Sequence, residues 1–378
     1  MFSCKQLGML LLAVAALLAG CQSSKPIQVG FVSELTGRNA VLGVQARNGA
    51  QMAVDEINAR QGINQQPLEL LVYDNTGKQD ELLVADQQLI DRQVVAITGH
   101  TTSWETVAAL DLLQKQNMIL FSPTTSTPSL DQIHDNFFRL IPSNVSQAYP
   151  LAEYLHNELH LQRVTVVYEA DNRAYTLSYV KAFLQHYNEQ GGQLVMESSY
   201  ASSQNPDFAS IVSSLRSAGD TDVLLVVASS VETALIAQNV RMQGWDVQIA
   251  SSNWAYTDDL LHNGGRAIEG ILITSQFNSD CQEPDYLAFK QTYQERYGDT
   301  PAFVGVFSYE TIQVLARALE QTGGKRAGLE AAIIQAGNFH GLCDDIIMDE
   351  YGDVQRTVYL IGIRDGKFEV IREYPPSP

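Results

Sequence analysis

Short apolar runs alternate with longer amphipathic segments along most of the chain. The runs are continuous, as at 27–34 (IQVGFVSE), 94–99 (VVAITG), 163–168 (RVTVVY) and 223–228 (VLLVVA). The segment 44–60 instead carries apolar residues three and four positions apart, which is typical of a helix. Strands buried on both faces read as continuous apolar runs, so the pattern predicts parallel sheets covered by helices.

The same alternation continues to the end of the chain and predicts the remaining elements. Further strands are expected at 68–73, 118–122, 194–198, 247–250 and 270–275, and further helices at 79–92, 104–116, 176–190, 208–218, 232–243, 286–297 and 307–321. Pro and polar residues interrupt the alternation at 140–145 and 274–279. The pattern therefore predicts a two-lobed α/β protein, and ligands of open α/β sheets bind at the carboxyl ends of the strands.

The amino terminus has the pattern of a targeting segment. Lys5 precedes an apolar stretch at 7–18, which is shorter than the roughly 20 residues that span a bilayer as a helix. Small residues and then Cys21 follow, as in the bacterial lipoprotein signal. We expect residues 1–20 to be removed, lipid on Cys21 to attach the protein to a membrane, and 21–25 to form a tether. An ordinary secretory signal that contains a Cys is the alternative.

Composition and charge narrow the function classes. The chain has 378 residues with 24 Lys and Arg against 43 Asp and Glu, for a formal charge of −19. Such an acidic protein repels phosphate backbones, so we expect no nucleic-acid partner. An apolar content of 45% with only 18% charged residues excludes a disordered chain.

Cysteine is scarce, with four residues in the chain. Cleavage after residue 20 and lipid on Cys21 would leave Cys281 and Cys343 in a compartment where disulfides persist. These two residues either form a disulfide or remain two separate buried thiols, and the sequence leaves both readings open.

Motifs of catalysis are missing from the sequence. There is no G-x-G-x-x-G opening the first helix, no phosphate-binding loop and no G-x-S-x-G elbow. His156 and His160 are four positions apart but lack the H-E-x-x-H order and a third ligand. We therefore expect a protein that is not an enzyme and that holds no metal and no cofactor.

Hydroxyl-rich loops follow two neighbouring strands of the first half. The segment 99–106 (GHTTSWET) leads into a helix, and 123–128 (PTTSTP) follows the next strand. Hydroxyls and free backbone N–H groups at a helix start suit an anion, so the loops predict a site for a carboxylate. Capping of the helices by Ser and Thr is the alternative for either loop alone.

From Ile27 to about Ile371, the chain resembles the solute-binding proteins of branched-chain amino-acid (Leu/Ile/Val-binding) ABC importers. The order and spacing of several segments carry the resemblance: 30–37 (GFVSELTG), 48–58 (NGAQMAVDEIN), 99–103, 122–128, 138–140, 270–274 and 349–353. It implies the type I periplasmic-binding-protein fold, with two Rossmann-like doubly wound lobes joined by a three-strand hinge.

The resemblance also implies the division into lobes and the location. Lobe 1 would comprise 26–142 and 275–355, and lobe 2 would comprise 143–274 and 356–378. The protein would lie at the periplasmic face of a bacterial membrane and deliver its ligand to the transmembrane permease subunits. Gln22, directly after the lipidated residue, favours the outer over the inner membrane without deciding between them.

Site residues follow from the resemblance by position. Ser103, with Thr102 beside it, corresponds to the hydroxyl that holds the ligand carboxylate. The remaining positions implied to contact the ligand are Thr124, Thr125 and Ser126 at its polar head, Tyr175 across it from lobe 2, Phe277 in a side-chain pocket and Leu42 at a lid.

One departure from the family pattern concerns charge. Relatives that bind α-amino acids place an acid where this chain has Asn253 or Trp254, and neither residue carries charge. Asp171 or Glu310 could replace that acid, although each also fits a structural role. We therefore expect an amino acid or a related small polar solute, such as an amide or a carboxylate. Trp104, beside Ser103, either narrows the pocket or belongs to the core.

Two functions are consistent with the sequence. The first is the substrate-binding lipoprotein of an ABC importer, whose lobes close over a small polar ligand. The alternative is an envelope regulatory lipoprotein that uses the same fold to bind a protein partner, such as a cell-wall synthase, without transport.

Overall fold

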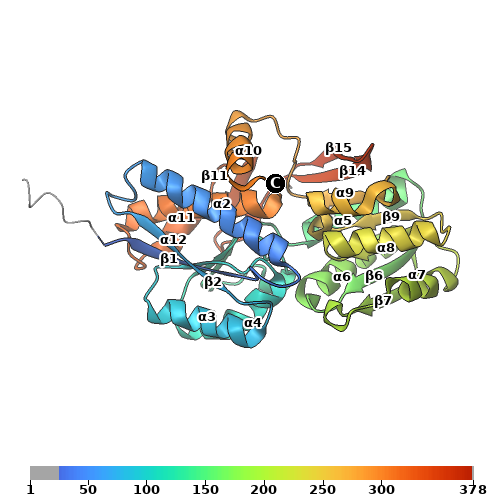
Figure 1. The fold of residues 1–378 in the computed structure, drawn as a ribbon, viewed down its shortest axis with the longest axis horizontal. Helices are drawn as coiled ribbons and strands as arrows, with labels where there is room; N and C mark the ends of the chain where they lie inside the picture. Colours follow the sequence, from blue (N-terminus) through green and yellow to red (C-terminus); the bar gives the residue numbers. More distant parts are fainter. Residues whose placement is uncertain (1–24, 377–378) are drawn as a thin grey trace, which may run out of the picture.

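Two lobes lie side by side along the longest axis of the molecule (Figure 1). The computed structural model describes residues 25–376. Each lobe contains a central sheet with helices on both faces, as the continuous apolar runs predict, so the expected fold class is confirmed. The signal peptide at 1–20, the lipidation site Cys21 and the neighbouring Gln22 lie outside the described residues.

The first lobe is built on a parallel sheet with the strand order β2-β1-β3-β4-β5. Alternate side chains of β1 point to opposite faces, so Phe31 packs with one layer of helices and Val32 with the other. The strands are β1 (Ile27–Ser33), β2 (Leu68–Asp74), β3 (Ile97–Gly99), β4 (Leu120–Ser122) and β5 (Phe137–Arg139).

Helices α2 (Ala40–Ala59) and α11 (Phe303–Thr322) lie on one face of this sheet, although they are far apart in sequence (Figure 1). Their axes approach closely, because a Cβ atom on Gly49 would lie only 1.9 Å from the carbonyl oxygen of Gly305. The other elements of this lobe are α3 (Gln79–Asp91), α4 (Ser103–Lys115), η2 (Pro128–Leu130), α10 (Pro284–Tyr297), α12 (Leu329–Ala336) and a small antiparallel sheet of β11 (Phe339–His340), β12 (Asp345–Met348) and β13 (Val354–Gln355).

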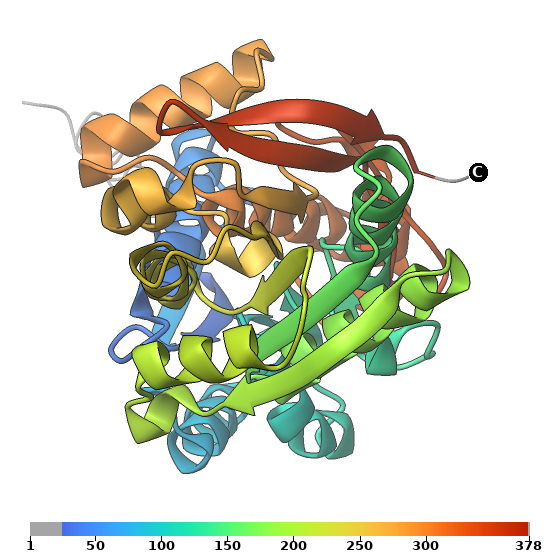
Figure 2. The same ribbon diagram turned by 90° about the vertical axis from the view of Figure 1, so that its right-hand side faces the viewer.

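The second lobe contains the larger sheet, in the order β15-β14-β10-β9-β8-β6-β7. Strands β6 to β10 run parallel, and an antiparallel hairpin of β14 and β15 forms one edge (Figure 2). The strands are β6 (Arg163–Glu169), β7 (Gln193–Tyr200), β8 (Val223–Val227), β9 (Gln248–Ser251), β10 (Leu272–Ser275), β14 (Val358–Arg364) and β15 (Lys367–Tyr374).

Helical segments cover both faces of the larger sheet. They are α5 (Val145–Glu153), η3 (Tyr154–Glu158), α6 (Arg173–Glu189), η4 (Ser202–Gln204), α7 (Phe208–Ser217), α8 (Ser230–Met242), η5 (Asn253–Ala255), α9 (Asp258–Gly264) and η6 (Gly265–Ile268). The sequence pattern did not predict α5, which contains Pro150.

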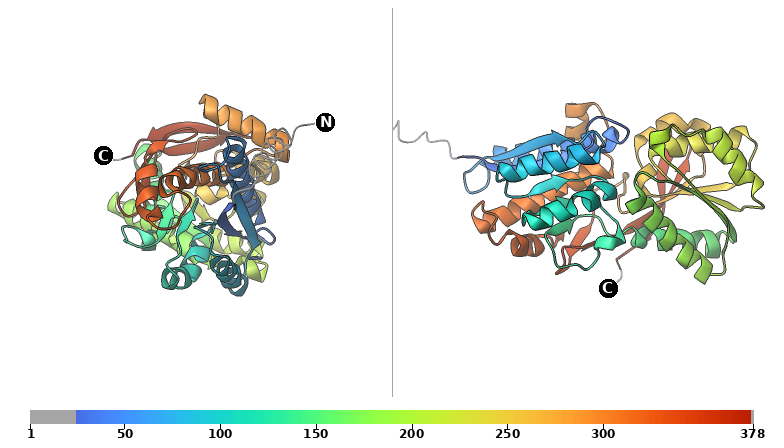
Figure 3. Two further views of the ribbon diagram at one scale, coloured as in Figure 1. Left: turned by 90° about the vertical axis from the view of Figure 1, so that its left-hand side faces the viewer. Right: turned by 90° about the horizontal axis from the view of Figure 1, so that it is seen from below.

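The chain passes between the lobes three times, after β5, after β10 and between β13 and β14. The junction between the two bodies is visible from below (Figure 3). No helix within residues 25–376 combines the length and the hydrophobicity that would be needed to cross a membrane.

Candidate functional site

A small cavity lies between the two lobes, and we call it the inner cavity. Its volume is about 30 Å³, enough for two or three water molecules. Eight of the residues expected to contact ligand line it: Leu42, Thr102, Ser103, Thr124, Ser126, Tyr175, Asn253 and Trp254. The structure thus brings most of the candidate site residues together from five separate segments of the chain.

On the side of the first lobe, the inner cavity is bounded by the start of α4, which follows β3 after a loop at 100–102. Thr102 caps this helix, and its hydroxyl and backbone N–H both donate to Oε2 of Glu105 at 2.8 Å. This capping box uses the Glu105 carboxylate within the helix start. Ser103, the first residue of the helix, lines the cavity. The positive end of the helix dipole therefore faces the cavity.

The loop after β4 is joined to this helix start by hydrogen bonds. The hydroxyl of Thr124 donates to the carbonyl of Thr101 at 2.8 Å, and the backbone N–H of Ser126 donates to Oγ of Ser103 at 3.3 Å. Beneath them, the Ser122 hydroxyl donates to the carbonyl of His100 at 2.8 Å. The two hydroxyl-rich loops thus form one continuous surface on the cavity.

The wall from the second lobe is aromatic. Tyr175 stands in the first turn of α6, and its ring meets the ring of Trp254 edge to face at 6.0 Å between centroids. Only 7% of Tyr175 is exposed, and burial raises the pKa of its hydroxyl, which stays neutral at physiological pH. That hydroxyl lies near Ser252 and the backbone of Trp254 but makes no hydrogen bond of good geometry with either. Tyr175 therefore lines the cavity and carries a buried hydroxyl without a hydrogen-bond partner.

Contacts across the cleft hold the lobes together. The backbone N–H of Trp104, in α4, donates to Oδ1 of Asn172, immediately before α6, at 3.2 Å. Arg38 of the first lobe donates to Oδ1 of Asn205 in the second at 3.4 Å. The structure therefore shows a closed arrangement of the two lobes.

Two candidate residues do not line the inner cavity. Thr125 is fully buried behind it, where its hydroxyl bonds the hydroxyl of Thr106 at 2.7 Å. Phe277 packs instead among the aromatic rings of Tyr256, Tyr286 and Phe307 beside the hinge. Phe277 therefore lies outside the lining of the inner cavity, and its assignment to a ligand side-chain pocket stays a prediction.

Three lining residues were not predicted from the sequence: Ile141, Asn172 and Phe303. Thr101, which also lines the cavity, lies within the predicted hydroxyl-rich loop at 99–106. A signal existed for Asn172, which precedes a helix at the carboxyl end of β6, where Asn is a common cap. Nothing in the sequence distinguished Ile141 or Phe303 from other core residues. Phe303 reaches the cavity because α11 begins four residues before the expected helix start at 307.

All the residues that line the inner cavity are uncharged. Glu310, one suggested counter-charge, pairs instead with Arg356 at 2.8 Å in the buried core next to the hinge. Asp171, the other suggested counter-charge, is exposed and lies outside this cavity. The half-buried Trp104 also lies outside it. A ligand ammonium in the inner cavity would therefore meet no carboxylate.

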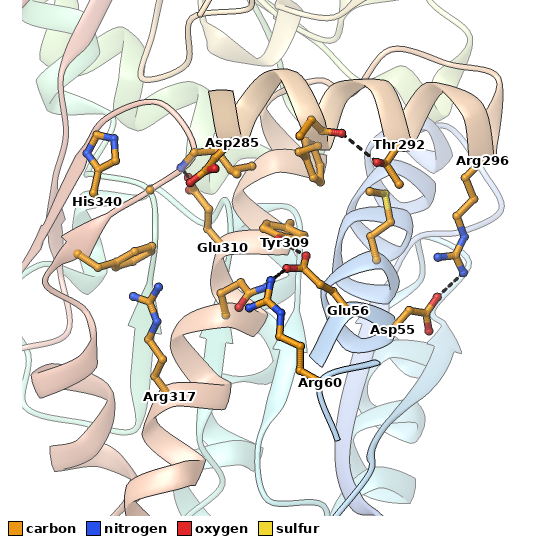
Figure 4. Close-up of a pocket in the computed structure, with 17 residues that line it drawn as sticks. Asp55, Glu56, Arg60, Asp285, Thr292, Arg296, Tyr309, Glu310, Arg317 and His340 are labelled. Atoms are coloured by element: carbon orange, nitrogen blue, oxygen red, sulfur yellow. Dashed lines mark hydrogen bonds and ion pairs between the residues drawn. The ribbon is translucent and has the colours of Figure 1, made fainter. Parts of the chain in front are cut away.

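A second, larger hollow of about 650 Å³ lies on the outside of the first lobe, between α2, α10 and α11 (Figure 4). Two arginines on it are already paired, Arg60 with Glu56 and Arg296 with Asp55. Every element that forms it belongs to one lobe. Movement of the two lobes relative to each other would therefore not enclose a ligand in this hollow.

Cys281 and Cys343 form a disulfide close to this hollow, which is lined by the neighbouring Leu342. Cys281, in the segment after β10, forms a disulfide with Cys343 before β12, with 6.0 Å between their Cα atoms. Across residues 25–376, no cluster of three or more His, Cys, Asp or Glu side chains is arranged to hold a metal ion.

A cavity that lies between two α/β lobes and is lined by residues of both is the arrangement of a two-lobed ligand-binding protein. Residues 26–367 match the family model described as "Periplasmic binding protein", and the chain belongs to this family. It is 25% identical over 369 residues to the "Leu/Ile/Val-binding protein homolog 1" of Brucella melitensis, covering 96% of this chain and 98% of the other. The expected relationship to the Leu/Ile/Val-binding family is thereby confirmed.

Solved structures show the same fold. A leucine-binding protein from Thermotoga maritima superimposes with a TM-score of 0.84 at 23% identity, covering 93% of this chain and 99% of that one. A solute-binding protein of an R. palustris ABC transporter, in complex with 4-hydroxybenzoate, gives a TM-score of 0.83 at 19% identity, covering 94% and 98%. These matches confirm the type I periplasmic-binding-protein fold.

Proposed function

We propose that the protein is the extracytoplasmic substrate-binding component of an ABC importer and binds a small polar solute that carries a carboxylate. The main supporting observation is the inner cavity between the lobes, which is lined by buried hydroxyl-bearing residues from both of them. The names of relatives support it, since the matched proteins include binding proteins for amino acids and for an aromatic carboxylate. The protein would bind its ligand without making or breaking a covalent bond.

The carboxylate of the ligand would lie at the start of α4. The Ser103 hydroxyl and the end of the helix dipole favour negative charge there. The unpaired hydroxyl of Tyr175 would donate to the ligand from the opposite lobe. A ligand that contacts both lobes stabilises the closed arrangement by the free energy of those contacts, which shifts the population of lobe conformations.

The moving bodies would be the two lobes, 26–142 with 275–355 and 143–274 with 356–378. The three chain crossings, at the ends of β5 and β10 and before β14, support these bounds as hinge positions. Leu42, Thr124, Ser126, Asn253 and Trp254 would complete the contact surface. The closed lobes would then present one surface to the transmembrane permease subunits.

Attachment to the membrane would be through lipid on Cys21, at the periplasmic face. The test is mass spectrometry of the amino terminus of the processed protein, with Cys21→Ser as the comparison. We expect a diacylglyceryl-modified Cys21 in the wild type and no lipid on the Cys21→Ser chain. An unmodified chain released by ordinary signal cleavage would contradict the lipid anchor. Fractionation of the membranes would then locate the lipoprotein, and Gln22 favours the outer membrane.

Isothermal titration calorimetry of the purified protein tests the binding function. The panel would contain α-amino acids, ω-amino acids, amides, and aliphatic and aromatic carboxylates. We expect at least one saturable ligand with a carboxylate, and affinity reduced about tenfold by Ser103→Ala or Tyr175→Phe, since each removes a hydrogen bond to a charged group. Ser129→Ala and Tyr149→Phe, which lie outside the cavity, are the matched controls and should bind as wild type.

Absence of any saturable ligand across this panel would contradict the proposal. Recovery of a cell-wall synthase and no permease in a crosslinking pull-down would then favour the alternative, a regulatory lipoprotein with a protein partner. Binding that is indifferent to both Ser103→Ala and Tyr175→Phe would instead place the ligand outside the inner cavity.

A further inference from the structure

The inner cavity is too small and too uncharged for a whole α-amino acid in the closed arrangement. Its volume of about 30 Å³ leaves room for little more than a carboxylate group. An α-ammonium held next to that carboxylate would be buried among neutral residues. A buried charge without a partner costs several kcal/mol. Glu105, directly behind Thr102, does not help, because the helix start already uses its carboxylate.

A second cavity adjoins the inner one, and we call it the outer cavity. Its volume is about 390 Å³, within the usual range for sites of small ligands. Asn172 and Trp254 line both cavities and so form their common boundary. Arg38 and Trp104 reach the outer cavity from the first lobe, while most of its wall belongs to the second. A ligand that extends from one cavity into the other would therefore also contact both lobes.

The chemistry of the outer cavity differs from that of the inner cavity. Glu169 lies on its wall with 2% exposure, and its carboxylate accepts backbone N–H groups of Asp171 and Asn172 at 2.6 and 2.8 Å. Glu232, on the same wall, accepts the hydroxyls of Ser229 and Tyr200 at 3.0 and 3.3 Å. All of these donors are neutral.

Ion pairs do not balance these acids. No Lys, Arg or His within residues 25–376 forms an ion pair with Glu169, Asp171 or Glu232. Arg38 is the one cation on the wall, and it donates to Asn205 instead. Trp104 and Trp254 add aromatic surface, which attracts cations through the face of the ring. The outer cavity therefore suits a cationic group on a hydrocarbon chain.

We propose that the ligand is an ω-amino carboxylate, with its carboxylate in the inner cavity at Ser103 and its ammonium in the outer cavity near Glu169 and Glu232. The proposal rests on the function proposed above and specifies its substrate class. The distance between the carboxylate end and the ammonium end of the site is short, because one residue contacts both. The side chain of Asn172 accepts from the backbone N–H of Trp104 in α4, while its own backbone N–H donates to Glu169. One residue thus bridges the two ends of the site.

The protonation of Glu169 gives the proposal a second observable. Burial, together with Asp171 and Glu232, raises the pKa of Glu169 to about 7. An ammonium placed beside it would lower that pKa, so binding near pH 7 would release protons. The other charged or titratable groups facing it are Tyr200 of β7 and Arg38 of the opposite lobe; burial raises the pKa of Tyr200 well above its usual value, so it stays neutral at this pH.

Calorimetry with matched ligands tests the proposal. The probes are γ-aminobutyrate, δ-aminovalerate and ε-aminocaproate, compared with valerate, which lacks the ammonium, and norvaline, which carries it at the α position. We expect one of the ω-amino acids to bind at least about tenfold more tightly than valerate or norvaline, as one charge-assisted contact allows. Titration in buffers of different ionisation enthalpy should show proton release for that ligand and none for valerate.

Variants locate the ammonium. Glu232→Gln should reduce the preference for the ω-amino acid over valerate about tenfold and leave valerate binding unchanged. Glu169→Gln should abolish the proton release. Glu197→Gln, on an exposed position of the neighbouring strand β7, is the control and should behave as wild type. Thermal unfolding establishes that each variant is folded. For each variant, the affinity for the ω-amino acid is divided by the affinity for valerate and compared with the same ratio in wild type. This comparison remains informative even where Glu169→Gln is less stable.

The experiments distinguish failure of the ω-amino carboxylate proposal from failure of the proposed binding function. Tight binding of valerate or norvaline in place of the ω-amino acids, with affinity lost in Ser103→Ala, would overturn the inference and leave the binding function intact. An ω-amino acid whose preference survives Glu232→Gln and whose binding releases no proton would also overturn it. Absence of any ligand in the full panel would overturn the proposed function itself.

Discussion

The backbone N–H of Trp104 donates a hydrogen bond to Oδ1 of Asn172 over 3.2 Å, and the two residues belong to different lobes. Trp104 lies in the first turn of α4, and Asn172 directly precedes α6. This contact spans the cleft at the boundary of the inner and outer cavities. It therefore ties closure of the lobes to the surface that would receive the ligand.

Asn172→Ala should weaken ligand binding about two- to tenfold, because one net hydrogen bond of roughly 0.5–1.5 kcal/mol is lost from the closed arrangement. Calorimetry with the ligand identified in the panel measures the effect. Asn157→Ala, an exposed position whose side chain bonds only within the second lobe, should leave affinity unchanged. Equal affinities for wild type and Asn172→Ala would show that this contact does not contribute to closure.

The stability of the protein should depend on the protonation of His100, which is buried beneath the start of α4. Burial alone would lower its pKa, but attraction to Asp86, a hydrogen bond that the imidazolium donates to Asp86, and the charge of Glu105 raise the pKa above the usual 6.5. Folding then favours the protonated imidazole. Its contribution is fully present below the unfolded value of 6.5 and is lost as pH rises through the raised folded value.

Urea unfolding between pH 6 and 8 checks this dependence. The free energy of unfolding of wild type should fall as pH rises, because the folded state loses the favoured proton on His100. His100→Asn should have a flatter profile than wild type. His262→Asn, on an exposed position of α9, should keep the wild-type profile. A profile for His100→Asn that parallels wild type would show that His100 stays neutral in the folded state.

Arg356→Met should be strongly destabilising, by about 3–5 kcal/mol, because it leaves two buried carboxylates without their cation. The guanidinium pairs with Glu310 at 2.8 Å and with Asp344 at 2.6 Å, and it also stacks over the ring of Phe307. The control is Arg364→Met, which breaks an exposed pair with Glu369 and should cost about 1 kcal/mol or less. Similar urea midpoints for the two variants would contradict the structural role of Arg356.

The disulfide between Cys281 and Cys343 should stabilise the folded protein by about 2–4 kcal/mol, since it closes a loop with a sequence separation of 62 residues. Cys281→Ala and Cys343→Ala should each lower the unfolding free energy by the same amount, and their effects should not add. Ligand affinity should stay unchanged, because neither residue lines a cavity between the lobes. Two free thiols in the oxidised native protein would contradict the pairing.

The sequence predicted most of the fold because strands that are buried on both faces must be apolar throughout. It did not predict α5, where Pro150 breaks the helical pattern, nor the hairpin of β14 and β15. A signal for that hairpin existed in Asp365-Gly366, two residues with positive φ of 51° and 69°, as a tight two-residue turn requires. Alternation of side chains on β15 is weak, which concealed the strand.

The candidate site was predictable where the chemistry is local. Hydroxyls at the start of α4 and after β4 predicted an anion site by composition alone, and the structure places Ser103 and Ser126 on the inner cavity. Residues such as Phe303 and Ile141 gain their place only through tertiary packing, because apolar side chains look alike in the core and at a ligand. The separate outer cavity was likewise beyond prediction, since Glu169 ends a strand whose register the sequence does not define.

In the proposed function, a small carboxylate-bearing ligand binds between the lobes and stabilises their closed arrangement. Small-angle X-ray scattering of the purified protein, titrated with the ligand found by calorimetry, tests this most directly. The radius of gyration should fall to a plateau at saturation, and Ser103→Ala should need about tenfold more ligand to reach the same plateau. A radius of gyration that stays constant while calorimetry shows the site filled would contradict the account.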